Sequence, residues 1–431
     1  MALSRFRVPH SAATALLWVL RVGIGAVFIF SGWSKSVDLH GFCLKIEEYL
    51  TAAGMSLPQE IVLMGATGVA TLEFVTGVML ATACLRRVAV WTAAAFMGVM
   101  LPLTIWTAVA DPVSDCGCFG DFVILSNTAT LIKNVFISAG VGLLWVFNGR
   151  RRGLYPAPVQ WLVIVATWLY PLAIGYTGYQ TQPTVDFRPF KTGTLLFDTS
   201  EGGESLFVYS KGGTEKAFGL DALPDSTWSF VRTESDVSDG ASIMVYDGDG
   251  EDCTEEFGDE ISASPRALLL IVSDPEAQFM TRAHYLQELN DYLRAGGVGM
   301  YALVGASGDA FDRWQRLTRP NFASYEAEDT SLKMLVRGSA GVVYLAEGRI
   351  LWKRTLGSLS PELPYSAKSA REVLDAMTAI DDGRFMWTLT FLYSGIMLVL
   401  YALGLSPRML SYLRRLTCGR KCPDDEKVCE S

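Results

Sequence analysis

Residues 62–83 read VLMGATGVATLEFVTGVMLATA, an apolar run whose single charge is Glu73. A helix that crosses the apolar core of a bilayer, about 30 Å thick, needs about 20 such residues. Five further runs have similar length and composition, at residues 14–33, 88–108, 125–147, 159–179 and 385–405. The sequence therefore predicts an α-helical membrane bundle with six spans, and the lipid bilayer is its first expected partner.

Residues 181–384, between the fifth and sixth runs, have an ordinary soluble composition. This segment carries 33 acidic and 19 basic residues, whereas the whole chain carries 45 acidic and 36 basic residues. The net charge of −9 thus comes from the soluble segment, and the membrane part is mildly basic. An acidic chain is not expected to bind nucleic acid. Three histidines in 431 residues disfavour a histidine-rich metal centre, and we predict no metal site.

Positive charges near the ends of the spans predict their orientation, because such residues favour the cytoplasmic side. Four basic clusters fall on one side if all six runs cross the membrane. They are Arg5 and Arg7; Arg86 and Arg87; Arg150, Arg151 and Arg152; and Arg408, Arg414, Arg415, Arg420, Lys421 and Lys427. We expect a multi-pass protein of a bacterial inner membrane with cytoplasmic termini and residues 181–384 in the periplasm. The first run is longer than a typical signal sequence, so we expect it to remain as an anchor.

Two charged residues lie within the first and second spans. Arg21 is about 7 residues and Glu73 about 10 residues from the cytoplasmic side, a difference of roughly 5 Å in depth. Because intramembrane charges are costly and usually paired, we predict a direct contact between Arg21 and Glu73. The pair either locks two helices together or contacts a proton or a quinone.

Other polar residues lie near the outer ends of the spans. Lys133, in the fourth span, is expected to extend outward toward an acidic residue of the preceding loop. The candidates are Asp111, Asp115 and Asp121. Lys35 and Asp38, at the end of the first span, are expected to act mainly as interfacial anchors.

The loop between the third and fourth spans contains the most specific motif, Asp115-Cys116-Gly117-Cys118-Phe119-Gly120-Asp121. Two extended cysteines at this spacing are too far apart to form a disulfide, but Gly117 and Gly120 allow the unusual backbone angles that would close the turn. A bridge in so small a ring should be strained and easily reduced. The alternatives are two ordinary thiols in a tight turn, or half of a metal site.

Three stretches of this region resemble the DoxX-like membrane proteins, and within them the MauE type (methylamine utilisation protein E). They are FIFSGWSKSVD at 28–38, LEFVTG at 72–77, and DPVS at 111–114 leading into the Cys-Gly-Cys loop. Residues 186–190, DFRPF, look like the junction of relatives with an added soluble domain. The resemblance implies a four-helix bundle similar to the vitamin-K-epoxide-reductase type, with further spans appended, and a role in disulfide formation or maturation of envelope proteins.

The resemblance and the composition together divide the chain into four parts. Residues 1–150 form the DoxX/MauE-like membrane domain, and residues 151–190 hold the fifth span and the junction. Residues 191–384 form an outer soluble domain, and residues 385–431 hold the sixth span and a basic cytoplasmic tail.

The remaining cysteines are placed by this topology. Cys43 lies outside, where it is a candidate resolving thiol for the Cys-Gly-Cys pair. Four cysteines fall on the cytoplasmic side, where thiols stay reduced. They are Cys84, Cys418, Cys422 and Cys429, and the spacing of the middle two is a weak zinc signal. Cys253 stands alone in an acidic stretch.

The soluble domain is predicted to be α/β and thioredoxin-like from about residue 260. The pattern indicates a strand, a helix, a strand, a helix, a two-strand hairpin and a final helix. These lie at 266–276, 277–295, 298–304, 308–318, 341–346, 349–354 and 367–379, and short β-like runs precede them at 205–209 and 242–246. A thioredoxin has Cys-x-x-Cys after the first of these strands, but here residues 273–277 read SDPEA. We therefore expect a redox-silent domain that binds a partner.

Two functions remain open from the sequence, and whether the protein is an enzyme is left open with them. In the first, Cys116 and Cys118 exchange disulfides with an envelope protein, and a membrane quinone would be a suitable electron acceptor. Asp115 and Asp121 would disfavour the reactive thiolate, whereas a nearby Lys35 or Lys133 would offset this. In the second, the protein is a non-enzymatic scaffold whose outer domain binds an envelope partner.

Overall fold

The computed structural model describes most of the chain. It covers residues 10–110, 113, 117–123, 125–147, 153–180, 182–183, 186, 188–197, 205–211, 214–218, 229–235, 243–275, 283–379 and 383–418. The chain divides into two compact units. The membrane unit comprises Met1–Tyr179, Pro183–Val185 and Asp382–Ser431, and the outer unit comprises Gln180–Gln182 and Asp186–Asp381.

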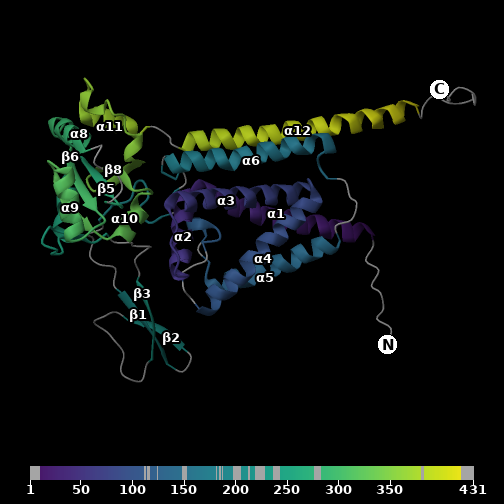
Figure 1. Cartoon of the computed structure of the whole chain (residues 1–431), viewed down its shortest axis with the longest axis horizontal. Helices are drawn as coiled ribbons and strands as arrows, with labels where there is room; N and C mark the ends of the chain where they lie inside the picture. Colours follow the sequence, from purple (N-terminus) through teal and green to yellow (C-terminus); the bar gives the residue numbers. More distant parts are fainter. Residues whose placement is uncertain are drawn as a thin grey trace, which may run out of the picture. The chain divides into compact units, whose positions relative to one another are not determined.

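Six helices of the membrane unit, among the described residues, are long and apolar enough to cross a bilayer. They are α1 (His10–Val37), α3 (Gln59–Thr82), α4 (Arg86–Ala110), α5 (Asn127–Val146), α6 (Ala157–Gln180) and α12 (Gly383–Cys418). The six predicted spans are thus confirmed as candidate membrane helices. A shorter helix that the sequence did not predict, α2 (Leu39–Ala52), follows α1 (Figure 1).

Close glycine contacts set the register between α1 and α3. A Cβ atom added to Gly25 would lie 2.8 Å from the carbonyl oxygen of Gly77, and one added to Gly32 would lie 2.7 Å from the carbonyl oxygen of Ala70 and would clash with the backbone nitrogen of Phe74. Only glycine permits so close an approach of two helix backbones, as in other membrane helix pairs. This packing fixes which polar residues of α1 and α3 face each other.

Helices α6 and α12 run side by side in the membrane unit (Figure 1). The ring of Tyr170 stacks on that of Tyr393 at 4.4 Å, and the Tyr170 hydroxyl lies 2.9 Å from Thr390 Oγ1. Tyr170 also contacts Phe74 of α3, with ring centroids 5.3 Å apart. These contacts attach the fifth and sixth spans to the first four.

The outer unit is built on a six-stranded mixed sheet with strand order β4-β7-β6-β5-β8-β9. The strands are β4 (Val245–Tyr246), β5 (Ala267–Val272), β6 (Gly299–Val304), β7 (Ala323–Ala327), β8 (Ala340–Ala346) and β9 (Arg349–Thr355). Strands β5, β6 and β7 are parallel, whereas β8 runs antiparallel to both β5 and β9. The predicted strand and hairpin order of the α/β core is thus present.

Strand β5 is buried on both faces, which explains its unbroken apolar sequence ALLLIV. Leu268, Leu270 and Val272 belong to a core with three helices. These helices are α8 (Ala283–Ala295), α9 (Asp309–Thr318) and α11 (Ala370–Met377). Leu269 and Ile271 belong to a second core, with α7 (Thr254–Ala263) and α10 (Asp329–Leu335).

Three of these elements were absent from the sequence prediction: α7, β7 and α10. The short runs at 205–209 and 242–246 do form strands, the first as part of a separate antiparallel sheet with order β2-β1-β3. Its strands are β1 (Ser205–Lys211), β2 (Thr214–Phe218) and β3 (Ser229–Ser235). The outer unit thus holds a small sheet besides the α/β core.

Candidate functional site

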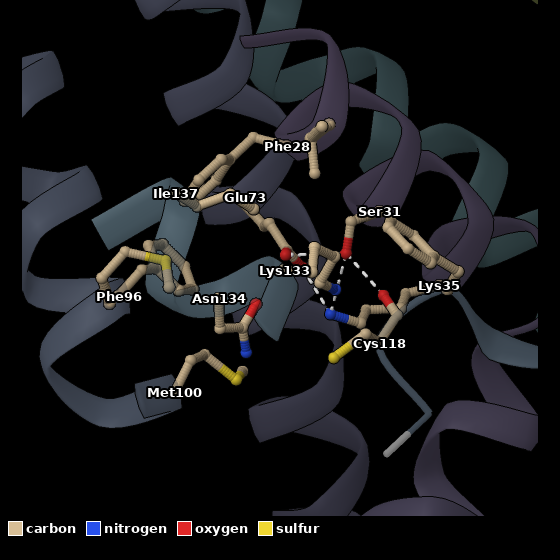
Figure 2. Close-up of a pocket in the computed structure, with 13 residues that line it drawn as sticks. Phe28, Ser31, Lys35, Glu73, Phe96, Met100, Cys118, Lys133, Asn134 and Ile137 are labelled. Carbon is tan, nitrogen blue, oxygen red and sulfur yellow. Dashed lines mark hydrogen bonds and ion pairs between the residues drawn. The ribbon is translucent and has the colours of Figure 1, made fainter. Parts of the chain in front are cut away.

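A small cavity lies in the membrane unit beneath the Cys-Gly-Cys loop (Figure 2). Its volume of about 30 Å³ has room for about two water molecules. Helices α1, α3, α4 and α5 and the loop all contribute to its wall. The lining residues are Val27, Phe28, Ser31, Lys35, Glu73, Phe96, Met97, Met100, Cys118, Phe119, Lys133, Asn134 and Ile137.

A buried ion pair forms one side of this cavity. Lys35 Nζ lies 2.6 Å from Glu73 Oε2, and the two residues are 2% and 8% exposed. Lys35 also donates to Ser31 Oγ at 3.2 Å. Each charge therefore has a partner inside the bundle, which is the usual condition for ionisable groups in a membrane.

Ser31 links the ion pair to the loop. Its Oγ lies 2.7 Å from Glu73 Oε1 and 2.6 Å from the carbonyl oxygen of Cys118, and Figure 2 shows both contacts. A serine hydroxyl has one proton to donate, so the carboxylate and the loop carbonyl share it. Ser31 therefore connects the Glu73 carboxylate to the backbone of Cys118.

The loop turns tightly above the ion pair. Gly117 and Gly120 have φ angles of +62° and +57°, and the backbone nitrogen of Gly120 donates to the Gly117 carbonyl at 3.2 Å. A Cβ atom at residue 117 would lie 2.5 Å from Cγ of Lys45, on α2. A side chain at Gly117 is thus disfavoured by both its φ angle and its surroundings.

Lys133 of α5 also lines the cavity. Its Nζ is 4.3 Å from the centroid of the Phe119 ring, a cation–π contact. The Phe119 ring in turn packs against Phe30 of α1 at 5.5 Å. Asn134, the next residue on α5, is buried and also lines the cavity.

The predicted contact between Arg21 and Glu73 is wrong, because Glu73 pairs with Lys35 and Ser31. Arg21 is buried but lies ten residues before Ser31, which is roughly 15 Å along α1. The prediction compared depths from the expected ends of the spans. The glycine contacts of α1 and α3 set a different register, which brings Lys35 to Glu73.

Two further expectations changed with the geometry. Lys35 was expected mainly as an interfacial anchor, but it is buried among the helices. Asp38 caps α2, since its Oδ1 accepts from the backbone nitrogen of Gly41 at 2.9 Å. Among the described residues Lys133 contacts Phe119; its expected partners Asp111 and Asp115, and the side chain of Asp121, lie outside the described part.

The three candidate thiols have different positions. Cys118 is half-buried at the cavity, whereas Cys116 lies outside the described residues. Cys43 of α2 is buried in an apolar cluster with Leu39 and Val62. Burial, together with the charges of Glu47 and Asp38, raises the pKa of the Cys43 thiol to about 12. A thiol so protonated is a poor nucleophile for a resolving role.

The role of Ser31 was not predicted from the sequence. A serine one helical turn before a lysine within an apolar span is a signal that could have been used, since residues at i and i+4 share a helix face. The second missing piece is the packing of Gly25 and Gly32 against α3, which decides that this face meets Glu73.

A comparison with known families finds a match that covers the residues of this site. Residues 13–147, which include most of α1, the loop and all of α5, match the family described as methylamine utilisation protein MauE. The chain therefore carries a MauE family domain. All the lining residues of the cavity lie within this MauE domain.

A second family match covers a short part of the outer unit. Residues 203–239 match a domain of unknown function, DUF8463, and the strands β1, β2 and β3 fall within these residues. A search of curated proteins found no match. The MauE domain is thus the part of the chain for which a family supports a functional argument.

Proposed function

We propose that this protein carries out thiol–disulfide exchange at the outer face of a bacterial inner membrane, through Cys116 and Cys118. The observation that carries the proposal is the ion pair of Lys35 and Glu73, which is joined by Ser31 to the backbone of Cys118. Burying ionisable groups within a membrane bundle is costly, so such groups commonly mark a functional site. Here they lie directly under a cysteine of the loop.

In the proposed reaction, two thiols of an envelope protein are oxidised to a disulfide while the Cys116–Cys118 disulfide is reduced to two thiols. Two electrons and two protons pass to the loop in this step. A membrane quinone, reduced to the quinol, would take them up and restore the disulfide. The cavity, with a volume of about 30 Å³, is too small to enclose a quinone ring, because ligand pockets typically measure about 300–1,000 Å³. We therefore propose that the quinone docks outside the cavity.

The proposed orientation has cytoplasmic termini and the loop and outer unit in the periplasm. The four basic clusters support it, and so does the chemistry, since disulfides persist outside the cytoplasm. We further propose that the α/β core of the outer unit is thioredoxin-like. The order β6-β5-β8-β9 with α8, α9 and α11 supports this identity.

A second candidate function is a membrane-anchored scaffold whose outer unit binds an envelope protein. It is favoured by the composition of the outer unit, where Cys253 is the only cysteine between residues 181 and 384. In the two functions the outer unit has the same role, to hold a partner. They differ in whether Cys116 and Cys118 react.

The proposal is tested in cells grown under conditions that require the protein. The double variant Cys116→Ser/Cys118→Ser should fail to support growth although it reaches the membrane in normal amount. Cys253→Ser, which changes a cysteine of the outer unit, should support growth like the parent. Full growth of the double variant would favour the scaffold.

A further inference from the structure

The charges around the cavity do not balance among the described residues that line it. Lys35 and Glu73 neutralise each other, and Lys133 adds a further positive charge. The groups from α4 are Phe96, Met97 and Met100, which are not titratable. The described lining residues thus carry a formal charge of +1, which belongs to Lys133.

A net positive charge in a small cavity within a membrane bundle favours an anion. Among the described lining residues, the remaining ionisable group is the thiol of Cys118. Figure 2 shows the Cys118 sulfur and the ammonium groups of Lys35 and Lys133 gathered around the same space. A thiolate at Cys118 would neutralise the cavity without any further ligand.

We propose that the cavity holds the Cys118 sulfur as a thiolate, with Lys133 as its counter-charge. Glu73 prevents Lys35 from taking this role, because it already neutralises the Lys35 ammonium at 2.6 Å. The cation–π contact with Phe119 positions Lys133 beside the loop, and no carboxylate among the described residues pairs with its ammonium group. The positive charge of Lys133 would oppose the effect of Asp115 and Asp121, which lie next to the cysteines in the sequence and disfavour a thiolate.

The inference deepens the proposed function and rests on it. When a partner thiolate attacks Cys116, the bond between Cys116 and Cys118 breaks and its electron pair leaves on the Cys118 sulfur. Lys133 stabilises this leaving thiolate, and a lower pKa makes a thiol leave faster. The mixed disulfide then forms at Cys116. Lys133 therefore determines which of the two sulfurs is attacked.

The experiment titrates Cys118 alone. The full chain carrying Cys116→Ser is reduced in lipid nanodiscs, and the rate of alkylation by iodoacetamide is measured between pH 5 and pH 10 by mass spectrometry of the peptide that contains residue 118. We expect half-maximal reactivity at least about one unit below the usual thiol value of about 8.5. Lys133→Met should raise this midpoint by about one unit or more, and Lys133→Arg should restore it.

Lys45→Met is the matched control, because Lys45 also lies beside the loop but is already paired with Glu48 at 2.7 Å. It should leave the midpoint unchanged. A midpoint near 8.5 in the protein with Lys133 intact overturns the inference without need of any change at 133, as does an unchanged midpoint in Lys133→Met. The titration requires no exchange reaction, so these two outcomes contradict the inference and not the proposed function. A low midpoint in a protein whose cysteines are never oxidised and reduced in cells would instead contradict the proposed function.

Discussion

Lys35 of the membrane unit and Lys353 of the outer unit are both buried beside a carboxylate, but their surroundings differ. Lys353 Nζ bonds Asp186 and the carbonyl oxygen of Phe190, and Asp186 also pairs with Arg188 at 2.7 Å. Burial, with Arg188 nearby, lowers the pKa of Lys353 to about 8, although Asp186 opposes the shift. Lys35 instead faces a cavity and a cysteine loop.

These surroundings distinguish a structural ion pair from one beside a candidate functional site. At Lys353 the donors and acceptors join the junction residues 186–190 to β9, which fastens the first segment of the outer unit. At Lys35 the same kind of pair is linked by Ser31 to a loop with a reactive side chain. Both ion pairs are buried, but only the pair at Lys35 lies beside a cavity and a cysteine among the described residues.

The largest expected effect is on stability, when one partner of either pair is removed. Glu73→Ala and Asp186→Ala each leave an uncompensated buried charge and should cost about 3–5 kcal/mol. Pulse proteolysis of the full-length protein in urea, with the fragments resolved by mass, reports which unit unfolds. Glu372→Ala, which removes an exposed partner of Lys368, should cost less than about 1 kcal/mol. Equal stability of all three variants would contradict the burial argument.

The next effect separates structure from function in the membrane unit. The double variant Lys35→Met/Glu73→Leu removes both charges, so its stability should stay close to that of the parent. The rate of thiol–disulfide exchange should fall by about tenfold or more, which corresponds to about 1.4 kcal/mol in the barrier. The measurement is the rate at which the oxidised loop is reduced by a small dithiol in nanodiscs. An unchanged rate would show that the ion pair of Lys35 and Glu73 is structural and does not contribute to exchange.

A smaller effect is expected from acid in the outer unit. Burial acts to raise the pKa of Asp186, but Arg188 and Lys353 outweigh it, and the pKa is lowered. The unfolded chain then binds more protons, so this stabilisation is complete above the unfolded value of about 3.9 and is lost as the pH falls through the lowered pKa. Asp186→Asn should flatten the pH dependence of stability below pH 4, and an unaltered slope would count against it.

The smallest effect is expected at Cys43. Its thiol is buried and its pKa is raised, so Cys43→Ala should leave the redox cycle of the loop unchanged. The measurement is the same dithiol reduction, followed by reoxidation. A variant that is reduced but cannot be reoxidised would show instead that Cys43 resolves the pair.

Much of the fold could be predicted from apolar patterns. The six spans follow from run length, and β5 follows from an apolar run that is buried on both faces. Strand β7 was not predicted because its sequence, ASYEA, is only partly buried and contains no such apolar run. Helix α10 is short, and its pattern does not extend over enough residues to be recognised.

The site was predicted only in part, because it depends on contacts between helices. The sequence identified Cys118, Lys35, Glu73 and Lys133 separately. It did not pair Lys35 with Glu73, since that pairing follows from the register of α1 and α3, and the register follows from backbone contacts at Gly25 and Gly32. A charged residue in a span thus predicts that a partner exists, but the sequence alone does not identify that partner.

The redox state of Cys116 and Cys118 in cells tests whether the two cysteines form a reversible disulfide. Acid-quenched cells grown with oxygen are treated with a mass-tagged maleimide, before and after mild dithiothreitol, and Cys116→Ser is compared with the parent. We predict that the parent gains two tags after dithiothreitol and loses them again when the reductant is removed, whereas Cys116→Ser gains none. A pair that stays reduced in oxygen, or stays oxidised in mild dithiothreitol, would contradict thiol–disulfide exchange at this loop.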